Sequence, residues 1–488
     1  MTGQASNTNP PWQPTTAPVW TLVGLFVATT AMFLVVAAKL LVILFPLGAF
    51  SLGVFLYRRY PAHYVSFTWW MWFLTPFVRR LIDYRCGYFT PGTYTVTSLL
   101  VTAISLETLI RYLPRVWNQA GLPFILCIGS VLYAFAVRIV RQPILGPHSE
   151  FIILLQWLTP LAFAFYLFIH WRRYPAYRDA VQRTFLWAVI LMGVYGVLQF
   201  LLVPPWDRQS MFWTLGAYEG WMGKAEPLEI RVWSTMDTPF TFALNIMPGL
   251  ILLLLSRSPW RFVAAGVGYL SFLLTQHRTA WYCWAIAVVL LIPSLKGRHQ
   301  FRMLLSGFVL LGVVAALATQ EPFSTVIHER LGTFANLAED GSGQSRLAQF
   351  QSVQDLAMTE VVGFGFLSRN ADGGSYLGFS GTDMGGLQLL ISLGWLGTIP
   401  YILGLLLLFV RSFQIRAFPS DNFAIACRVI AVASFLRIAT TAVTYGDYAM
   451  PVWGFLGIAI SAYYYHLYAY DELYAQDIPA ASFVEKET

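Results

Sequence analysis

Residues 19–57 read VWTLVGLFVATTAMFLVVAAKLLVILFPLGAFSLGVFLY, two apolar runs separated by a single charged side chain, Lys39. Each run has close to the roughly 20 mainly apolar residues that an α-helix needs to cross the hydrocarbon core of a bilayer. This stretch therefore predicts two helices that cross a membrane one directly after the other.

Similar apolar runs recur along the rest of the chain and leave no long stretch for a separate soluble domain. By the same length criterion, the sequence predicts an all-α polytopic membrane protein with about 14 transmembrane helices. The predicted spans are 19–37, 40–57, 63–79, 92–110, 121–140, 151–171, 183–203, 239–256, 260–276, 279–294, 302–319, 384–410, 424–443 and 449–468.

The composition favours the same class of protein. The chain is 57% hydrophobic and 11% charged, whereas soluble domains average about 25% charged residues. The net charge is +7, but the basic residues lie mostly in short turns between apolar runs, as orientation signals do. We therefore expect no nucleic-acid partner.

The cysteines and the N-terminal segment carry no strong signal. The four cysteines, Cys86, Cys127, Cys283 and Cys427, are far apart and form no metal-binding or disulfide pattern.

Residues 1–18 lack charged side chains, so they are read as a flexible tail and not as a cleavable signal, which would open with a basic region.

Basic residues in short loops mark the cytoplasmic side of a membrane protein. The strongest basic turns lie around Arg58, Arg172, Arg257, Lys296 and Arg411, and alternation through the predicted spans puts all of them on one side. Both termini are then cytoplasmic. Five arginines fall near the other face as exceptions, either misplaced by the predicted spans or functional: Arg79, Arg80, Arg85, Arg138 and Arg141.

The two longest predicted loops are rich in acidic residues and lie outside. In the larger one, apolar residues recur at helical spacing over 341–360, which predicts an amphipathic helix on the membrane face. The chain divides into a cytoplasmic tail (1–18), N-terminal spans (19–203), a first periplasmic loop (204–238), spans that carry Arg278 (239–319), a large, partly helical periplasmic loop (320–383), C-terminal spans (384–468) and a cytoplasmic tail (469–488).

The external side gathers several arginines. Arg278 lies in a very short turn between two apolar runs, Arg231 lies just before a span, and Arg330 and Arg346 lie in the large loop. Arginine presents a planar fork that binds phosphate oxygens in pairs, and an arginine between apolar runs is costly unless it has a partner. The alternative is that these side chains pair with nearby acids or reach to the interface.

Three further external residues have two interpretations each. His277 and His328 are either surface residues or catalytic groups. Asp383 opens the span after the large loop, where it either caps the helix by accepting hydrogen bonds from free backbone amides or acts in catalysis.

Short motifs follow one another in a fixed order over about a third of the chain. They are Arg231 to Pro239 followed by Phe242-Ala243; Thr275-Gln276-His277-Arg278; Ser345-Arg346-Leu347 and Gly363-Phe364-Gly365 in the larger loop; and Asp383-Met384 followed, after nine residues, by Gly394 and then Thr398. In order, topology and spacing this region resembles the family of O-antigen ligases and Wzy-type polysaccharide polymerases. Ligases of that family usually carry His at the position of Asp383, so Asp383 points to the polymerase branch, although Met384 departs from both.

The resemblance implies a GT-C-like fold in the bacterial inner membrane, with the active site facing the periplasm. The implied activity is metal-independent, inverts the configuration at the anomeric carbon, and polymerises undecaprenyl-pyrophosphate-linked repeat units into an exopolysaccharide or O-antigen. Arg278 and Arg231 would hold the pyrophosphate and Asp383 would be the base, while Arg346, Arg330 and His328 would bind substrate. The implied partners are the lipid-linked donor, a glycan acceptor, the bilayer and chain-length or export proteins, with no cofactor.

Two alternatives stay open. An O-antigen ligase would move the glycan to a lipid A core or another acceptor. A flippase for lipid-linked oligosaccharide would also suit about fourteen spans, but it should line a two-sided cavity with charges, and few ionisable residues fall within the predicted spans: Lys39, Glu107, Arg138, Arg428 and Arg437.

Overall fold

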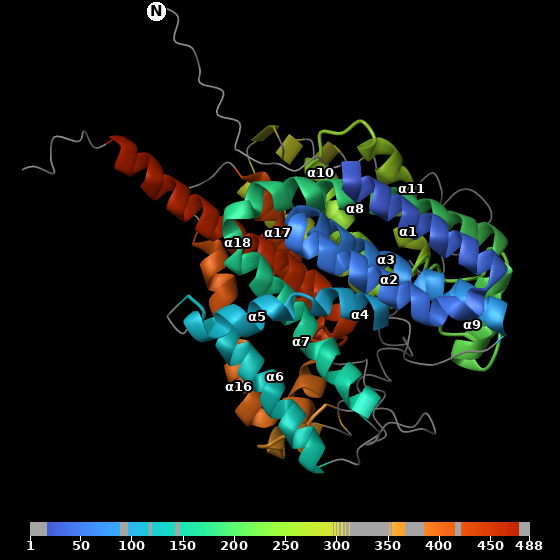
Figure 1. The fold of residues 1–488 in the computed structure, drawn as a ribbon, viewed down its shortest axis with the longest axis horizontal. Coiled ribbons are helices and arrows are strands. Elements are labelled where there is room, and N and C mark those ends of the chain that lie inside the picture. The colour runs from blue at the N-terminus through green and yellow to red at the C-terminus, as the bar shows by residue number, and fades with distance from the viewer. Residues whose placement is uncertain are drawn as a thin grey trace, which may run out of the picture.

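The structure, a computed structural model, describes residues 17–87, 96–116, 120–141, 147–295, 351, 354–366, 385–414 and 421–477, with a few isolated positions between 297 and 312. These residues are mostly helical (Figure 1). The longer helices are α1 (Ala17–Val36), α2 (Ala38–Arg59), α3 (Pro61–Cys86), α4 (Val96–Ala103), α5 (Leu106–Tyr112), α6 (Leu122–Arg141), α7 (Pro147–Ile169), α8 (Tyr174–Leu202), α9 (Pro205–Leu215), α10 (Pro239–Leu255), α11 (Arg261–Leu274), α12 (Arg278–Leu291), α16 (Gly385–Phe413), α17 (Asn422–Leu436) and α18 (Gly446–Asp477).

Eight helical segments of the described residues are long and apolar enough to cross a membrane, so the chain is a multi-pass, helical membrane protein. They are 17–36, 38–59, 96–115, 122–141, 150–169, 171–202, 385–413 and 422–439. A helix occupies every predicted span except 302–319, which lies mostly outside the described residues. The predicted count of about fourteen is not confirmed, because α10, α11 and α12 are apolar but short.

The segment 204–238, predicted as a loop, contains regular structure. Pro205 stands in the first turn of α9, where its missing N–H costs nothing, and Gly216 ends the helix with φ 70°. Strands β1 (Glu219–Gly220) and β2 (Gly223–Lys224) then pair in an antiparallel hairpin. The predicted amphipathic helix over 341–360 lies mostly outside the described residues.

Three helices form the centre of the bundle. Residues 159–168 of α7, 241–253 of α10 and 449–462 of α18 are buried without interruption, as expected of helices that are apolar all round. Helix α18 packs against α7 and α17, α8 packs against α11, and α6 lies beside α16 (Figure 1). By contrast, α1 leaves most of its apolar side chains exposed, which is the surface that lipid would cover.

Contacts between distant segments bring several helix ends together. The end of α3, the start of α10, the turn between α11 and α12, and the end of α17 are joined through Arg80, Met236, His277 and Arg437. The start of α18 lies at the same end, because Asp447 interacts electrostatically with Arg437. The candidate functional residues lie here.

Candidate functional site

The turn between α11 and α12 presents His277 and Arg278. Thr275 ends α11 and its hydroxyl accepts a hydrogen bond from the His277 N–H at 3.2 Å. Gln276 has φ 54°, a left-handed conformation that is uncommon for a residue other than glycine. Arg278 is then the first residue of α12. The tight turn keeps both predicted side chains at the helix end, and neither can move far from it.

The segment that carries Arg231 is bound to the same turn. The N–H of Val232 donates to the Leu274 carbonyl at 3.1 Å, and the N–H of Arg231 donates to the Met222 carbonyl at 2.9 Å. The side-chain amide of Gln199 accepts from the backbone of Trp233 and of Ser234. Two predicted residues from separate loops, Arg231 and Arg278, thus stand on backbone segments that are joined directly.

Arg437 lies fully buried at the end of α17, in the short 3₁₀ segment Arg437–Ala439. Its Nη2 donates to Nε2 of His277 at 3.2 Å. Its Nε and Nη1 have no hydrogen-bond partner among the described residues. A buried guanidinium with unused donors is costly, and it is equipped to receive the oxygens of an anion.

Two carboxylates from different elements interact with each other in this region, and one of them, Asp447, also interacts with Arg437. Asp447, in the first turn of α18, is 6% exposed, and its Oδ2 has no hydrogen-bond partner among the described residues. Asp237 precedes α10, is half-buried and accepts a hydrogen bond from the Thr241 hydroxyl. The negative charges of Asp237 and Asp447 repel each other.

The environment of Asp237 works against its ionised form. Burial raises the pKa of Asp237, although the hydrogen bond from Thr241 and the positive charge of Arg80 act in the opposite direction. A carboxylate whose pKa is raised is a stronger base than an ordinary one. The site therefore combines unused cationic donors with carboxylates suited to proton transfer.

Arg80 fastens the loop that presents Arg231 and Asp237. This side chain is 1% exposed, and it donates hydrogen bonds to the carbonyl oxygens of Ser234 and Met236. Its Nε lies 3.4 Å from Oδ1 of Asp207 in α9. The sequence marked Arg80 as an exception to the charge pattern, and this network gives the buried side chain its partners.

Asp207 is held by more than Arg80. The hydroxyl of Tyr195 donates to it at 2.6 Å. Burial raises the pKa of Asp207, although the positive charge of Arg80 and the hydrogen bond from Tyr195 oppose the shift. Unlike Asp447, this carboxylate is engaged in fixing the loop.

The two glycine motifs of the sequence meet at a break in α16. Gly394 has φ 61° and ψ −178° inside this helix, so the backbone groups around it are free to bond elsewhere. The N–H groups of Phe364 and Gly365 donate to the carbonyls of Ile391 and Ser392 at 2.8 and 2.9 Å. The sequence identified Gly363-Phe364-Gly365 and Gly394 separately; only the fold pairs them.

Arginines of α6 anchor the same segment. Arg138 is 1% exposed; it pairs with Glu150 of α7 through two hydrogen bonds and donates to the Phe366 carbonyl at 2.7 Å. Arg141 pairs with Glu360 at 2.7 Å and donates to the Gly363 carbonyl. These two exceptions to the charge pattern thus hold the end of the large loop.

An aromatic stack connects this anchored segment to the start of α18. The ring of Trp157 in α7 stacks on Phe366 at 4.5 Å between centroids and on Tyr445 at 5.7 Å. Tyr445 stands two residues before Asp447. The broken helix and the carboxylates therefore belong to one continuous region of the fold.

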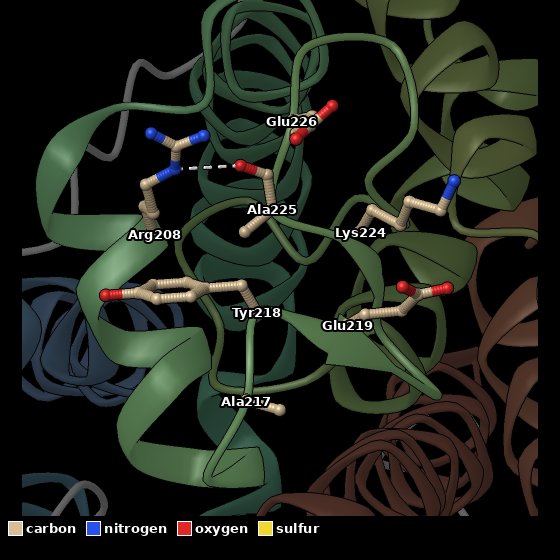
Figure 2. A pocket seen from close by; sticks show the side chains of 7 residues that line it. All are labelled: Arg208, Ala217, Tyr218, Glu219, Lys224, Ala225 and Glu226. Atoms are coloured by element: carbon tan, nitrogen blue, oxygen red, sulfur yellow. Dashed lines mark hydrogen bonds between the residues drawn. The ribbon is translucent and has the colours of Figure 1, made fainter.

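A hollow of about 490 Å³ opens beside the β-hairpin. Figure 2 shows Arg208 and Tyr218 on one side of it and Glu219 and Lys224 on the other. Arg208 is held by a hydrogen bond to the Ala225 carbonyl at 2.9 Å. Next to it, the partly exposed ring of Trp221 stacks on Phe240, whose edge contacts His277. The polar groups of the hollow and the exposed ring of Trp221 therefore lie close to the turn that presents His277 and Arg278.

The predicted site residues divide into two sets. Arg278 and Arg231 lie in the region described above, while Asp383, Arg346, Arg330 and His328 lie outside the described residues. The sequence reasoning missed Asp447, and it weighed Arg437 only as a charge within a span. For Arg437 the available signal was that an ionisable residue inside an apolar run is a functional candidate by default; Asp447 lies between two predicted spans and has no such signal.

Among the described residues, no group of three or more His, Cys, Asp or Glu side chains is placed to hold a metal ion. Comparisons with family models, with curated proteins and with solved structures find no match to this chain.

Proposed function

We propose that the protein is a membrane glycosyltransferase that polymerises oligosaccharide repeat units carried on undecaprenyl pyrophosphate. The observation that carries this proposal is Arg437, a fully buried guanidinium with two unused donor groups, beside His277 and the turn that presents Arg278. A pyrophosphate supplies the anionic oxygens that such a group requires. The resemblance of the motifs between Arg231 and Thr398 supplies the substrate class.

The arginines would stabilise the leaving group. As the bond from the anomeric carbon to the pyrophosphate breaks, negative charge grows on the pyrophosphate oxygens. Fixed cationic donors in a site of low polarity stabilise such charge strongly. Arg437, Arg278 and Arg231 are the residues proposed for this role, with Arg346 and Arg330 as further donors and His328 as a further substrate contact.

The acceptor is a sugar hydroxyl of another glycan chain. Its oxygen attacks the anomeric carbon from the side opposite the pyrophosphate, so a single displacement inverts the configuration there. Its proton passes to a carboxylate, for which Asp383 is the candidate by position in the family motif. The exposed rings and polar groups around the hairpin suit sugar binding, because aromatic faces and polar side chains are the groups that line ligand sites.

The finer features of the fold and location belong to the same proposal. They are about fourteen spans, a GT-C-like arrangement, the bacterial inner membrane, both termini in the cytoplasm and a site that faces the periplasm. In that orientation Arg80, Arg138 and Arg141 would lie near the outer face, where their contacts with loop segments would hold them. Chain-length or export proteins are the proposed partners.

The decisive experiment uses the purified full-length chain in lipid vesicles, without any ion gradient. The substrate is lipid-linked glycan extracted from cells of the source organism that lack this gene. We expect longer glycan chains to appear on the lipid. A product formed only when a lipid A core acceptor is added would identify a ligase, and movement of the lipid across the bilayer without elongation would identify a flippase.

Arg437 is tested against a matched arginine of the same helix. Arg428 lies in the middle of α17 and donates to the Ser412 carbonyl. We expect Arg437→Gln to lower elongation by about 100-fold or more, in the range that loss of a stabilising donor costs, and Arg428→Gln to retain most activity. Arg437→Lys keeps the charge but not the planar fork, so it should recover only part of the rate. Full elongation by Arg437→Gln would overturn the pyrophosphate role.

A further inference from the structure

The described part of the site contains a second possible proton acceptor besides the position taken from the family motif. Asp447 and Asp237 come from opposite parts of the chain, at the start of α18 and just before α10. They lie close enough for their charges to interact. Asp447 is almost fully buried, and its Oδ2 has no hydrogen-bond partner among the described residues.

The charged and titratable groups that face this pair are few. Arg437 approaches from the end of α17, Arg80 acts on Asp237 from α3, and Tyr448 lies next to Asp447 on α18. No salt bridge within 4.0 Å joins either carboxylate to a cation among the described residues. Two neighbouring carboxylates in such surroundings favour a state in which one of them holds a proton.

Comparison with Asp207 argues against a purely structural role. Asp207 is also buried, but it is engaged by Arg80 and by the Tyr195 hydroxyl. Structural carboxylates in protein interiors are paired in this way. Asp207 Oδ1 and Asp447 Oδ2 both lack a hydrogen-bond partner among the described residues. What sets Asp447 apart is that no cation lies within 4.0 Å of it in the described part of the chain, whereas Asp207 has Arg80, and that the guanidinium of Arg437, which interacts with Asp447, has unused donors.

We propose that Asp447, with Asp237 as its partner, accepts the proton of the attacking sugar hydroxyl; this inference rests on the proposed function. The acceptor oxygen forms a bond to the anomeric carbon of the donor as its O–H bond breaks, and the proton moves to the Asp447 carboxylate. The bond from the anomeric carbon to the pyrophosphate oxygen breaks, and its electron pair leaves with undecaprenyl pyrophosphate. The proton then passes to water.

Asp237 serves as a positioning residue in this step. Its carboxylate is held by Thr241, so it stays next to Asp447 and can take up the shared proton when the pair rests. Arg437 interacts with Asp447, and it is the residue proposed to bind the leaving group. The arrangement places the acid–base pair and the anion-binding arginine within one set of helix ends.

The test separates proton transfer from donor binding. The purified full-length chain in vesicles is assayed for elongation of extracted lipid-linked glycan, and undecaprenyl pyrophosphate alone is used to measure binding. The variants are Asp447→Asn, Asp237→Asn and Asp383→Asn, with Asp179→Asn as a surface control, since Asp179 is exposed beside Arg178. Thermal unfolding of each variant confirms that it is folded.

We expect Asp447→Asn to lower kcat by about 100-fold or more, as loss of a general base does, while binding of undecaprenyl pyrophosphate changes little. The wild-type rate should fall at acidic pH, the acid limb of the pH–rate profile, because Asp447 becomes protonated. The residual activity of Asp447→Asn should lack this fall. Asp237→Asn should lower kcat by a smaller factor, and Asp179→Asn should leave it unchanged.

Distinct outcomes overturn distinct claims. If wild-type protein elongates glycan and a folded Asp447→Asn variant does so within tenfold, or keeps the acid limb, the role of Asp447 is wrong and the proposed function stands. If Asp383→Asn alone removes the acid limb, the base is Asp383. If the wild type does not elongate glycan in the same assay, the proposed function fails, and this inference fails with it.

Discussion

The backbone of Gly363 lies directly against the backbone of Gly394, so that a Cβ on Gly363 would come within 2.5 Å of the Gly394 nitrogen. Both residues have positive φ, 86° and 61°. One belongs to the end of the large loop and the other to the break in α16, and the contact fixes the loop on the helix. Neither position has space for a side chain.

Substitution at this contact should therefore destabilise the protein. We expect Gly394→Ala to lower the free energy of unfolding by at least about 1–3 kcal/mol, because its backbone conformation is almost restricted to glycine and the added Cβ meets the Gly363 segment. Gly129→Ala in α6 is the control, since nothing lies within 4 Å of its Cβ position. Thermal unfolding in detergent compares the two. Equal unfolding temperatures would show that the loop does not pack on α16 in this way.

The pair of Arg80 and Asp207 should behave as a coupled unit. Arg80→Met leaves Asp207 buried without its cation, and loss of one partner of a buried pair costs about 3–5 kcal/mol. We expect the double variant Arg80→Met with Asp207→Asn to be more stable than Arg80→Met alone. A double-mutant cycle from thermal or denaturant unfolding measures the coupling. Arg58→Met, at an exposed position, should have little effect. Strictly additive effects at Arg80 and Asp207 would contradict the pairing.

The two ion pairs that anchor the large loop should differ in strength. Arg138 and Glu150 are 1% and 10% exposed, while Arg141 and Glu360 are 37% and 18% exposed. We expect Arg138→Met to cost about 3–5 kcal/mol, as for a broken buried pair, and Arg141→Met about 0–1 kcal/mol, as for an exposed one. Unfolding in detergent at low and high salt measures both. Similar losses for the two variants would mean that burial does not set the strength of this anchor.

Asp421 at the start of α17 predicts a pH dependence of stability. Its carboxylate accepts hydrogen bonds from the Tyr174 hydroxyl and from the N–H groups of Phe423 and Ala424, and lies 2.9 Å from His466. Burial acts to raise the pKa of Asp421, but the hydrogen bonds with His466 and Tyr174 outweigh it, and the net shift is downward.

A pKa that is lower in the folded state means that the unfolded chain binds the proton more tightly. The stability that Asp421 contributes is therefore complete above its unfolded pKa of about 3.9, and it is lost as the pH falls through the lower folded value. We expect Asp421→Asn to lower the unfolding temperature at pH 7 and to have a smaller effect below pH 4. If the decrease in unfolding temperature caused by Asp421→Asn became larger as the pH fell, the pKa of Asp421 would not be lowered in the folded protein and this prediction would be wrong.

The helices were predictable because each long apolar run is sufficient to form one helix. The run from Val19 to Tyr57 satisfies its backbone within each helix and needs no distant partner to do so. The helix α9 and its hairpin were not predicted, because 204–238 has no apolar period. Its local signals are Pro205 at the start of the helix and Gly216 after its end. Proline and glycine occur in loops as often as at helix ends, so they do not identify a helix.

The candidate site was only partly visible for a different reason. Arg278 and Arg231 stand out in the sequence because each is a charge at the edge of an apolar run, which needs a partner. Asp447 gives no such signal, since an acid in a short turn between two spans is unremarkable. Its significance depends on Asp237 and Arg437, which are far away in the sequence and reach it only through the packing of α10, α17 and α18.

The amino-acid sequence was enough to specify a chain of membrane helices, because hydrophobic length acts locally. The tertiary structure alone decided which of those residues meet. It paired Gly363 with Gly394, tied Arg80 to the loop before α10, and enclosed Arg437 and Asp447 with unused hydrogen-bonding groups. Such pairings are set by how helices pack against one another, and no local stretch of sequence encodes them.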